Sequence, residues 1–193
     1  MSERNHTATR ILDTAQQLAQ TRGFNAFSYA DIAERVGVRT ATLHYYFPSK
    51  RDLGRELLAR YHDSFRQLFA RLDREGTTPC EQLGRYVEAI RQMLLDGGRM
   101  CLGGMLAADI ATLSPDLQSE VRAFCTTNEA WLARVLAAGR ATGTLRFAGT
   151  PEEEALVLFA GLEGAMLIAR PYDDPARFAT VARLLLAALG AGP

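Results

Sequence analysis

The sequence predicts an all-α fold of about nine helices. Apolar residues recur every three to four positions along most of the chain, as they do on one face of an amphipathic helix. Three prolines directly follow a hydroxyl residue (Thr78-Pro79, Ser114-Pro115 and Thr150-Pro151), which is typical of an N-cap followed by the first helical position. No segment alternates polar and apolar residues for long enough to indicate a strand.

Glycine, proline and hydroxyl residues mark the helix ends. Gly23 and Gly37 are typical C-terminal stops, Pro48 ends a short helix, and Ser28 and Ser49 are expected N-caps. The helices are expected over residues 7–22, 29–36, 39–46, 50–73, 79–96, 101–112, 115–142, 151–169 and 175–189.

Two domains are expected within the 193 residues. A three-helix, helix-turn-helix DNA-binding domain is predicted over residues 1–50, and a helical ligand-sensing and dimerisation domain over residues 51–193. The long helix that begins after Ser49 joins them. A hydrophobic content of 48% is sufficient for a buried core.

The charge is divided unevenly between the two parts. The 22 basic and 22 acidic residues give a net charge of zero, which by itself argues against nucleic acid as a partner. Residues 1–60, however, hold nine basic and six acidic residues, a net charge of +3 that the remainder balances. This asymmetry favours a nucleic-acid partner for the N-terminal part.

Other classes of protein find little support. No run of 18 apolar residues and no apolar leader is present, so neither a membrane span nor export is expected, and a cytoplasmic location follows. The three cysteines (Cys80, Cys101 and Cys125) are too scattered for a disulfide framework or a zinc site. We expect no cofactor and no metal.

Residues 27–50 carry the most specific pattern. Two short helices meet at the turn Val36-Gly37-Val38-Arg39, which is typical of a helix-turn-helix whose second helix enters a DNA major groove. The second helix presents hydroxyl, guanidinium and imidazole groups that suit phosphates and base edges. A helical hairpin with core aromatics and capping hydroxyls is the alternative, since this geometry also occurs outside DNA-binding proteins.

The segment from residue 10 to residue 60 resembles the DNA-binding domain of the TetR family of bacterial transcription regulators. The resemblance rests on the following stretches in register: Ile11-Leu12-Asp13-Thr14-Ala15, Arg22-Gly23-Phe24, Asp31-Ile32-Ala33, Gly37-Val38, Thr42-Leu43, Tyr45-Tyr46-Phe47 and Ser49-Lys50.

The resemblance implies specific DNA contacts. Ser28 and Tyr29 are expected at phosphates, Arg39, Thr40, Ala41 and His44 at bases, and Thr42, Tyr45, Tyr46 and Lys50 mostly at the DNA backbone. The family most often carries tyrosine where this chain has His44, which predicts an operator that differs from those of close relatives. We expect Arg39 to form a bidentate contact with guanine.

Two C-terminal helical segments, 155–169 and 178–189, are apolar nearly all round, which indicates burial on more than one side. The family resemblance implies a four-helix bundle across a two-fold axis, and the core of a monomer is the alternative. The residues expected at the dimer interface are Leu158, Gly161, Leu162, Ala165, Val181, Leu184, Leu185 and Ala188.

Cys101 is a candidate for reaction with electrophiles or oxidants. It lies where a helix is expected to begin, and the helix dipole together with Arg99 favours a thiolate there. The stretch resembles the TetR subgroup that contains the repressor of N-ethylmaleimide reductase, which carries a Gly-Cys-Leu turn at this place; here Met100 stands in place of the glycine. The alternative role of Cys101 is that of a small buried apolar residue.

The inducer pocket is expected among the central helices, where apolar side chains are mixed with a few polar groups. Besides Cys101, its candidate residues are Met93, Met105, Phe124, Asn128, Trp131, Leu132, Phe159, Glu163 and Met166, each of which also suits the core. Glu163 is a lone charge in an apolar run and needs a partner, which could be an arginine, a group of the dimer mate or a cationic ligand.

The predicted function is that of a homodimeric transcriptional repressor. It binds a palindromic operator of double-stranded DNA and releases it on a small-molecule or electrophile signal. The alternatives are a small all-α cysteine-dependent enzyme or small-molecule carrier without DNA binding, and a DNA-binding protein without a ligand. No catalytic motif supports an enzyme, and His6, His44 and His62 are badly spaced for a metal.

Overall fold

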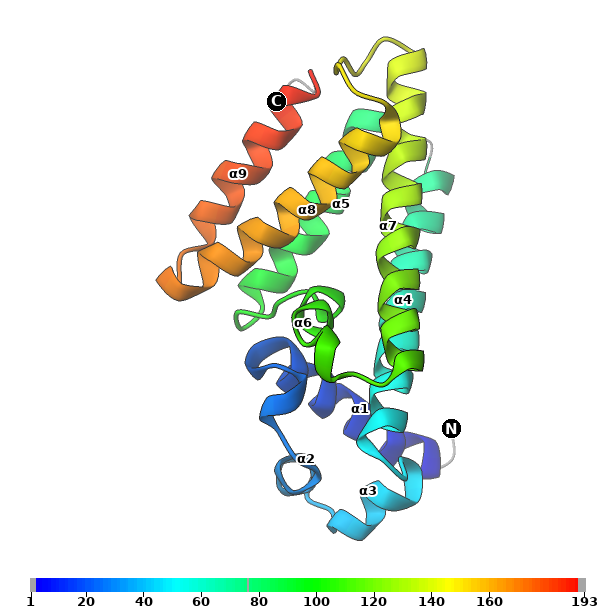
Figure 1. Ribbon diagram of the computed structural model, residues 1–193, viewed down its shortest axis with the longest axis vertical. Helices are drawn as coiled ribbons and strands as arrows, with labels where there is room; N and C mark the ends of the chain where they lie inside the picture. Colours follow the sequence, from blue (N-terminus) through cyan, green and yellow to red (C-terminus); the bar gives the residue numbers. More distant parts are fainter. Residues whose placement is uncertain (1–2, 76, 191–193) are drawn as a thin grey trace. The chain divides into compact units, whose positions relative to one another are not determined.

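The computed structural model describes residues 3–75 and 77–190, and within these the fold consists of helices and connecting turns (Figure 1). The nine α-helices of the described residues are α1 Glu3–Arg22, α2 Tyr29–Val36, α3 Thr40–Tyr46, α4 Lys50–Arg74, α5 Pro79–Leu95, α6 Leu102–Ala108, α7 Pro115–Ala141, α8 Pro151–Ala169 and α9 Pro175–Ala188. Short 3₁₀ turns lie at Phe24–Ala26, Ile110–Thr112 and Arg170–Tyr172. The all-α prediction is confirmed.

Capping boxes explain why the helix starts agree so closely with the expected ones. Thr78 Oγ1 accepts a hydrogen bond from the Glu81 amide while the Glu81 carboxylate accepts one from the Thr78 amide, and Thr150 and Glu153 repeat the arrangement. Each box pairs two of the amide groups that a helix start leaves unsatisfied. These contacts lie within four residues of sequence, so the sequence alone reveals them.

One expected helix is shorter than predicted. The segment expected over 101–112 is helical from Leu102 to Ala108 and then tightens into the 3₁₀ turn Ile110–Thr112. The Thr112 hydroxyl donates to Asp109 O at 2.7 Å, and Gln118 Nε2 donates to the carbonyl of Ile110 at 3.1 Å. Side chains thus satisfy carbonyls that a continuous α-helix would have paired.

The chain divides into two compact units that do not follow a single cut in the sequence. Unit 1 comprises residues 1–63 and 102–123, and unit 2 comprises residues 64–101 and 124–193. Because α4 and α7 each continue across these limits, both helices contribute residues to both units.

Unit 1 is built around α1, whose buried residues include Ile11, Ala15 and Leu18. Arg10 Nη2 donates to Val36 O at 2.6 Å and thereby ties α1 to the end of α2. Arg51 on α4 pairs with Asp116 on α7 at 2.9 Å. Side chains of the longer helices therefore hold the end of α2 and join α4 to α7 within unit 1.

Unit 2 has an aromatic core closed at one end by a polar network. Phe69 stacks on Trp131 with ring centroids 4.5 Å apart, and Phe65 meets Phe124 edge-on at 5.3 Å. The Trp131 indole N–H donates to Asp73 at 3.2 Å.

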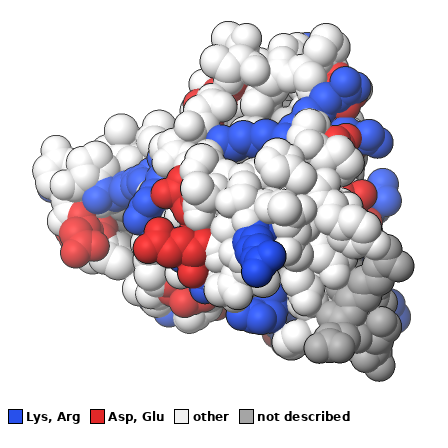
Figure 2. Space-filling model, turned by 90° about the horizontal axis from the view of Figure 1, so that it is seen from below, with Lys and Arg blue, Asp and Glu red and all other residues white. Residues whose placement is uncertain are grey.

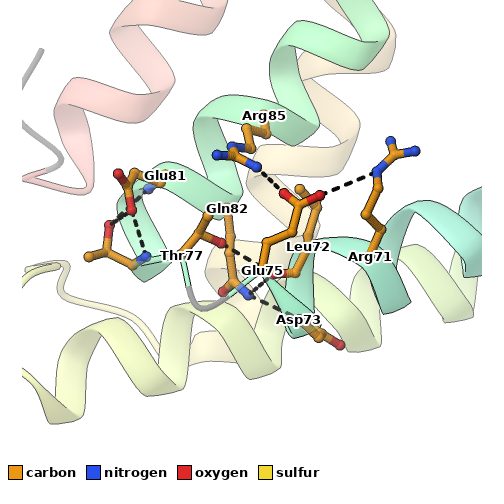
Figure 3. A network of polar contacts seen from close by, with 9 residues as sticks. Arg71, Leu72, Asp73, Glu75, Thr77, Glu81, Gln82 and Arg85 are labelled. Carbon is orange, nitrogen blue, oxygen red and sulfur yellow. Dashed lines mark hydrogen bonds and ion pairs between the residues drawn. The ribbon is translucent and has the colours of Figure 1, made fainter.

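Figure 3 shows the polar groups at the end of α4 and the start of α5. Gln82 Nε2 donates to Leu72 O at 3.3 Å, and the Glu75 carboxylate pairs with Arg85. Side chains of both helices thus join the end of α4 to the start of α5.

Helices α8 and α9 pack closely on each other within the subunit. A Cβ atom placed on Gly161 would lie only 2.8 Å from Leu185 Cδ1, so glycine permits this approach.

By length and composition alone, the stretch Pro151–Tyr172 would suffice to cross a membrane: its most apolar window has a mean hydropathy of 1.3, and 39% of that window is buried. The core helix of a protein that does not cross a membrane meets the same criterion.

Candidate nucleic-acid interface and sensor site

The turn between α2 and α3 has the geometry that a helix-turn-helix requires. Gly37 ends α2 in the left-handed conformation, with φ 74°, and its amide donates to Ala33 O at 2.9 Å. A side chain with a Cβ atom is strained there, which explains the glycine. At the other end of α2, Ser28 and Asp31 form a capping box.

The outer face of α3 is left open within the subunit. Leu43 is fully buried, whereas Arg39, Thr40, Ala41, His44 and Tyr45 are exposed. Thr42 and Tyr46 are half-buried. Within the part of the chain that the structure describes, the side chain of Arg39 makes no hydrogen bond or ion pair, so its guanidinium group is available to a partner.

His44 is oriented by its neighbours. Its ring packs on Tyr29 with centroids 4.7 Å apart, and its Nδ1 lies 3.3 Å from Pro48 O. With Nδ1–H donating to this carbonyl, Nε2 is the nitrogen that remains for a phosphate or a base.

Tyr29 lies inside the helix-turn-helix. The side chain is buried, and its hydroxyl donates to Phe47 O at 2.8 Å, linking the start of α2 to the end of α3. Burial, assisted by the charge of Asp52, raises the pKa of Tyr29 to about 12. The sequence suggested a phosphate contact, but in this structure the hydroxyl proton is already used internally.

Lys50 is also engaged within unit 1. Its ammonium group donates to Phe27 O at 2.5 Å and lies over the Phe24 and Phe27 rings, 5.1 and 4.5 Å from their centroids. Burial lowers the pKa of this amine. Here Lys50 holds the loop before α2 against the start of α4.

The basic charge is dispersed rather than continuous. On the face that Figure 2 shows, Lys and Arg form separate groups divided by uncharged side chains. The described part of α3 carries no Lys or Arg, and Arg39 stands directly before its first residue. Hydroxyl and imidazole donors must therefore supply much of any DNA contact on this helix.

A second polar site lies inside unit 2. Cys101, only 3% exposed, directly precedes α6. Burial raises the pKa of Glu163 on α8, and the Cys101 thiol offsets part of the rise. The Tyr86 hydroxyl donates to Asn128 Oδ1 at 3.1 Å, and Asn128 Nδ2 donates to Phe124 O at 2.9 Å. Burial, with Cys101, Glu163 and Cys125 nearby, raises the pKa of Tyr86 well above its ordinary value.

Sequence reasoning missed Tyr86, whose position among apolar residues of α5 marks it only as a core residue. The partner expected for Glu163, which is an arginine, a group of the dimer mate or a cationic ligand, stays a prediction.

The other expected pocket residues fall into two groups. Met105 belongs to unit 1, where its side chain lies near Gly23. The remaining ones belong to unit 2 and are mostly buried: Phe124, Asn128, Trp131, Leu132, Phe159 and Met166, with Met93 half-buried.

A groove of about 630 Å³ lies elsewhere in unit 2, between α5 and α9. Its lining includes Val87, Arg91, Phe178 and Arg183, and none of the expected pocket residues.

The expected dimer residues divide between the interior and the surface. Leu158, Leu162 and Ala165 are buried within the subunit, and Gly161 faces Leu185 of the same chain. Val181 and Leu184 are exposed, Leu185 is half-buried and Ala188 is exposed. Sequence reasoning missed the exposed apolar residues of α8, which are Leu156, Val157, Leu167 and Ile168.

Two short helices joined at a glycine turn, followed by a helical domain with an exposed apolar face, define a transcriptional regulator of the helix-turn-helix class. Comparisons with known proteins support the same class. The model of the bacterial regulatory proteins of the tetR family matches residues 11–57, and that of the tetracyclin repressor-like C-terminal domain matches residues 80–185. The chain belongs to the TetR family, whose members are transcriptional regulators and not enzymes.

Individual relatives cover most of the chain. The HTH-type transcriptional repressor NemR of Escherichia coli K12 is 29% identical over 167 residues, which cover 85% of this chain and 84% of NemR. A TetR family regulator from Agrobacterium tumefaciens has a solved structure with a TM-score of 0.93 and 35% identity, covering 97% of this chain and 99% of that one. The reduced form of E. coli NemR gives a TM-score of 0.79 at 26% identity, covering 93% and 95%.

These similarities confirm the predicted membership of the TetR family and the resemblance to the subgroup that contains NemR.

Proposed function

We propose that this protein is a homodimeric transcriptional repressor that binds a palindromic operator and is released by a small-molecule or electrophile signal sensed in unit 2. The observation that carries the DNA-binding part is the open polar face of α3, held on α2 by the Gly37 turn and by the Tyr29–Phe47 hydrogen bond. The curated relatives NemR and DhaR are both named transcriptional repressors.

We assign the DNA contacts from the exposure of each side chain. Arg39, Thr40, Ala41 and His44 face the bases, with the Arg39 guanidinium on guanine. Ser28, Thr42, Tyr45 and Tyr46 contact the DNA backbone. Tyr29 acts mainly by holding the motif together, because its hydroxyl proton is already donated to Phe47 O. Lys50 donates one ammonium hydrogen to Phe27 O and contacts the DNA backbone with the others.

The second subunit covers the exposed apolar residues of α8 and α9. Four of them on α8 (Leu156, Val157, Leu167 and Ile168) are more than half exposed, which is costly for a monomer in water. A two-fold axis through this face presents two copies of α3, and two copies match the two halves of a palindrome.

The signal acts at Cys101. The thiol is buried in unit 2, which also holds the aromatic core and most of the expected pocket residues. Modification changes the packing just before α6, which belongs to unit 1 together with α2 and α3. Release requires the modified protein to bind DNA less tightly than the unmodified one. We place this regulator in the cytoplasm, where its DNA lies.

The test begins with selection of bound sequences from a pool of random double-stranded oligonucleotides. We expect enrichment of an inverted repeat, and no enrichment would contradict the proposal. Treatment with N-ethylmaleimide should then release the selected DNA. Cys101→Ser should keep DNA binding and lose this release, and a Ser variant that still responds would exclude the thiol as the sensor.

A further inference from the structure

The groove between α5 and α9 has the size and the lining of a small-molecule site. Its volume of about 630 Å³ lies in the range of about 300–1,000 Å³ that such sites occupy in proteins. Val87, Phe178 and Ala182 line it, and each of these side chains is less than a tenth exposed. An apolar molecule of moderate size therefore gains by leaving water for this groove.

The two walls of the groove are joined at one end. Cys80 Sγ, at the start of α5, donates to Thr144 O at 3.5 Å, and the Arg146 amide donates to Leu189 O, directly after α9, at 2.8 Å. The segment between α7 and α8 thus joins the start of α5 to the end of α9. The two helices therefore run in opposite directions along the groove (Figure 1).

Gly84 lies in the interior of α5 and lines the groove, although nothing in the subunit requires a glycine there. A Cβ atom placed on it would meet no heavy atom within 4 Å, whereas one on Gly161 would lie 2.8 Å from Leu185. Glycine makes a helix interior less stable than alanine does. What it offers in return at this position is close approach of another molecule to the backbone of α5.

The groove and the exposed apolar residues of α9 lie on opposite faces of this helix. Ala182 lines the groove, whereas Leu184, an expected dimer residue, is 55% exposed. Two residues turn an α-helix by about 200°, which places these two side chains on opposite sides. A second subunit that covers Leu184 therefore leaves the groove accessible to a small molecule.

The charge that remains free in the groove is positive. Glu81 accepts hydrogen bonds from the Thr78 amide and hydroxyl at 2.7 and 2.9 Å, so its carboxylate is held in the helix cap. Arg91 donates to Glu88 through Nε at 2.7 Å and Nη2 at 3.0 Å. Within the described part of the chain, the side chain of Arg183 makes no hydrogen bond or ion pair. Its guanidinium group is therefore available to an anion.

We propose that the groove between α5 and α9 binds a small carboxylate with an apolar tail, whose carboxylate pairs with Arg183 and whose tail lies over Gly84. The inference names a ligand class for the small-molecule signal proposed above, and in that role it rests on the proposed function. Binding to the groove itself does not depend on that function.

A carboxylate matches the free charge better than other head groups do. One guanidinium group donates two parallel N–H bonds to the two oxygens of one carboxylate. A dianionic phosphate would leave further oxygens without a donor, since Arg91 is already held by Glu88. A cationic head group would be repelled by Arg183.

Isothermal titration calorimetry of the full-length protein with decanoate and decylammonium tests the charge preference. The two probes have the same length of apolar chain and opposite charges, and both are used below their micelle concentrations. We expect one decanoate per subunit, bound at least about tenfold more tightly than decylammonium. Arg183→Gln should weaken decanoate binding by about tenfold and should not weaken decylammonium binding. Arg177→Gln, which removes an α9 arginine outside the groove, is the matched control and should change neither affinity.

Substitutions of Gly84 test the place of binding. Gly84→Leu fills the open space above α5 and should abolish decanoate binding, while the helix content measured by circular dichroism stays unchanged. Gly84→Ala adds a single methyl group and should retain most of the binding. It should also raise Tm, because alanine stabilises a helix interior relative to glycine.

Unchanged decanoate affinity in a folded Gly84→Leu protein, or equal wild-type affinity for the two probes, would overturn the inference. A changed oligomeric state of Gly84→Leu in sedimentation velocity would also overturn it, since another protein surface would then occupy the groove.

Operator affinity with and without decanoate separates this inference from the proposed function. If decanoate binds in the groove and affinity for the selected DNA stays the same, the binding site stands and release through it is wrong. If no inverted repeat is selected, the proposed function fails, and the calorimetry still decides whether the groove binds a carboxylate.

Discussion

Helices α3 and α8 each leave one face uncovered within the subunit, but the two faces differ in chemistry. On α3 the uncovered side chains include Thr40, His44 and Tyr45, whereas on α8 they include Leu167 and Ile168. Both buried sides are apolar and include leucine, which is Leu43 on α3 and Leu158 and Leu162 on α8. The partner is therefore indicated by the kind of side chain that stays exposed and not by the burial pattern.

The contrast assigns each face a different kind of partner. Polar donors beside Arg39 can replace the water around phosphates and base edges. The leucine and isoleucine side chains of α8 gain only by leaving water, which a second copy of the same face allows. If the contrast is correct, substitutions on the exposed face of α8 should change dimer formation, and those on α3 should change only DNA affinity.

The largest effect is expected from Ile168→Glu, which places a charge on a side chain that is 60% exposed in the subunit. We expect a monomer in sedimentation velocity and a loss of operator affinity of about 100-fold or more, because two linked half-sites no longer bind together. Leu95→Glu, at a position on α5 that is 45% exposed, is the control and should remain dimeric. A dimeric Ile168→Glu protein would contradict the assignment of the α8 face.

Arg39→Ala should cost about 1–3 kcal/mol of operator affinity and should relax discrimination at one base pair, because a bidentate contact with guanine is lost. Fluorescence anisotropy with operators substituted one base pair at a time measures both effects. Arg74→Ala removes a charge from unit 2 and should change neither. A uniform loss on all sequences would make Arg39 a phosphate contact instead.

Tyr29→Phe tests whether Tyr29 acts inside the motif. It leaves the buried Phe47 carbonyl without its donor and should lower the free energy of unfolding by about 1–2 kcal/mol. Operator affinity of the folded protein should change little. Tyr45→Phe, at a side chain that is 60% exposed, should leave the free energy of unfolding in denaturant nearly unchanged and should lower operator affinity. Matching effects of the two substitutions on affinity would mean that Tyr29 contacts DNA directly.

The smallest effect concerns the capping box of α2. Hydrogen bonds from the Ser28 hydroxyl and amide hold the pKa of Asp31 below its ordinary value of 3.8. A lowered pKa in the folded state stabilises the protein above that ordinary value, and this contribution disappears as the pH falls through the lowered one. Asp31→Ala should therefore lower Tm slightly at neutral pH. The difference in Tm between this variant and the wild type should disappear at acidic pH.

Glu34→Ala removes another exposed carboxylate from α2 and serves as the control, with a smaller expected change in Tm. A difference between the Asp31→Ala protein and the wild type that stays constant down to acidic pH would contradict the role of the Asp31 carboxylate in the cap.

The elements of the fold could be predicted because their signals are local. Ser28 with Asp31, and Thr150 with Glu153, cap their helices within four residues, and Gly37 marks the turn by itself. The face that α8 exposes could not be predicted in the same way. An apolar residue stands on every side of that helix, so its sequence gives no direction.

Residues of the candidate DNA-binding surface could be predicted only where the exposure of a side chain follows from helix periodicity, as on α3. The hydroxyl of Tyr29 finds its acceptor 18 residues away, and the hydroxyl of Tyr86 donates to Asn128 across 42 positions. Contacts of this kind depend on the tertiary packing of several helices. Residue type and spacing suggested a phosphate contact for Tyr29, whose hydroxyl proton the structure pairs internally. The expected contact of Lys50 with the DNA backbone stays a prediction.

The most direct test of DNA binding by the α3 face is the salt dependence of affinity for the selected inverted repeat, measured for the wild type and for Thr40→Glu. We expect wild-type affinity to fall steeply, by about 10³-fold between about 50 and about 200 mM salt if roughly six phosphates are contacted. Thr40→Glu, which adds a negative charge to the exposed face of α3, should remain dimeric and lose binding. Affinity that is insensitive to salt, or unchanged in Thr40→Glu, would contradict the assignment of α3 as the DNA-binding surface.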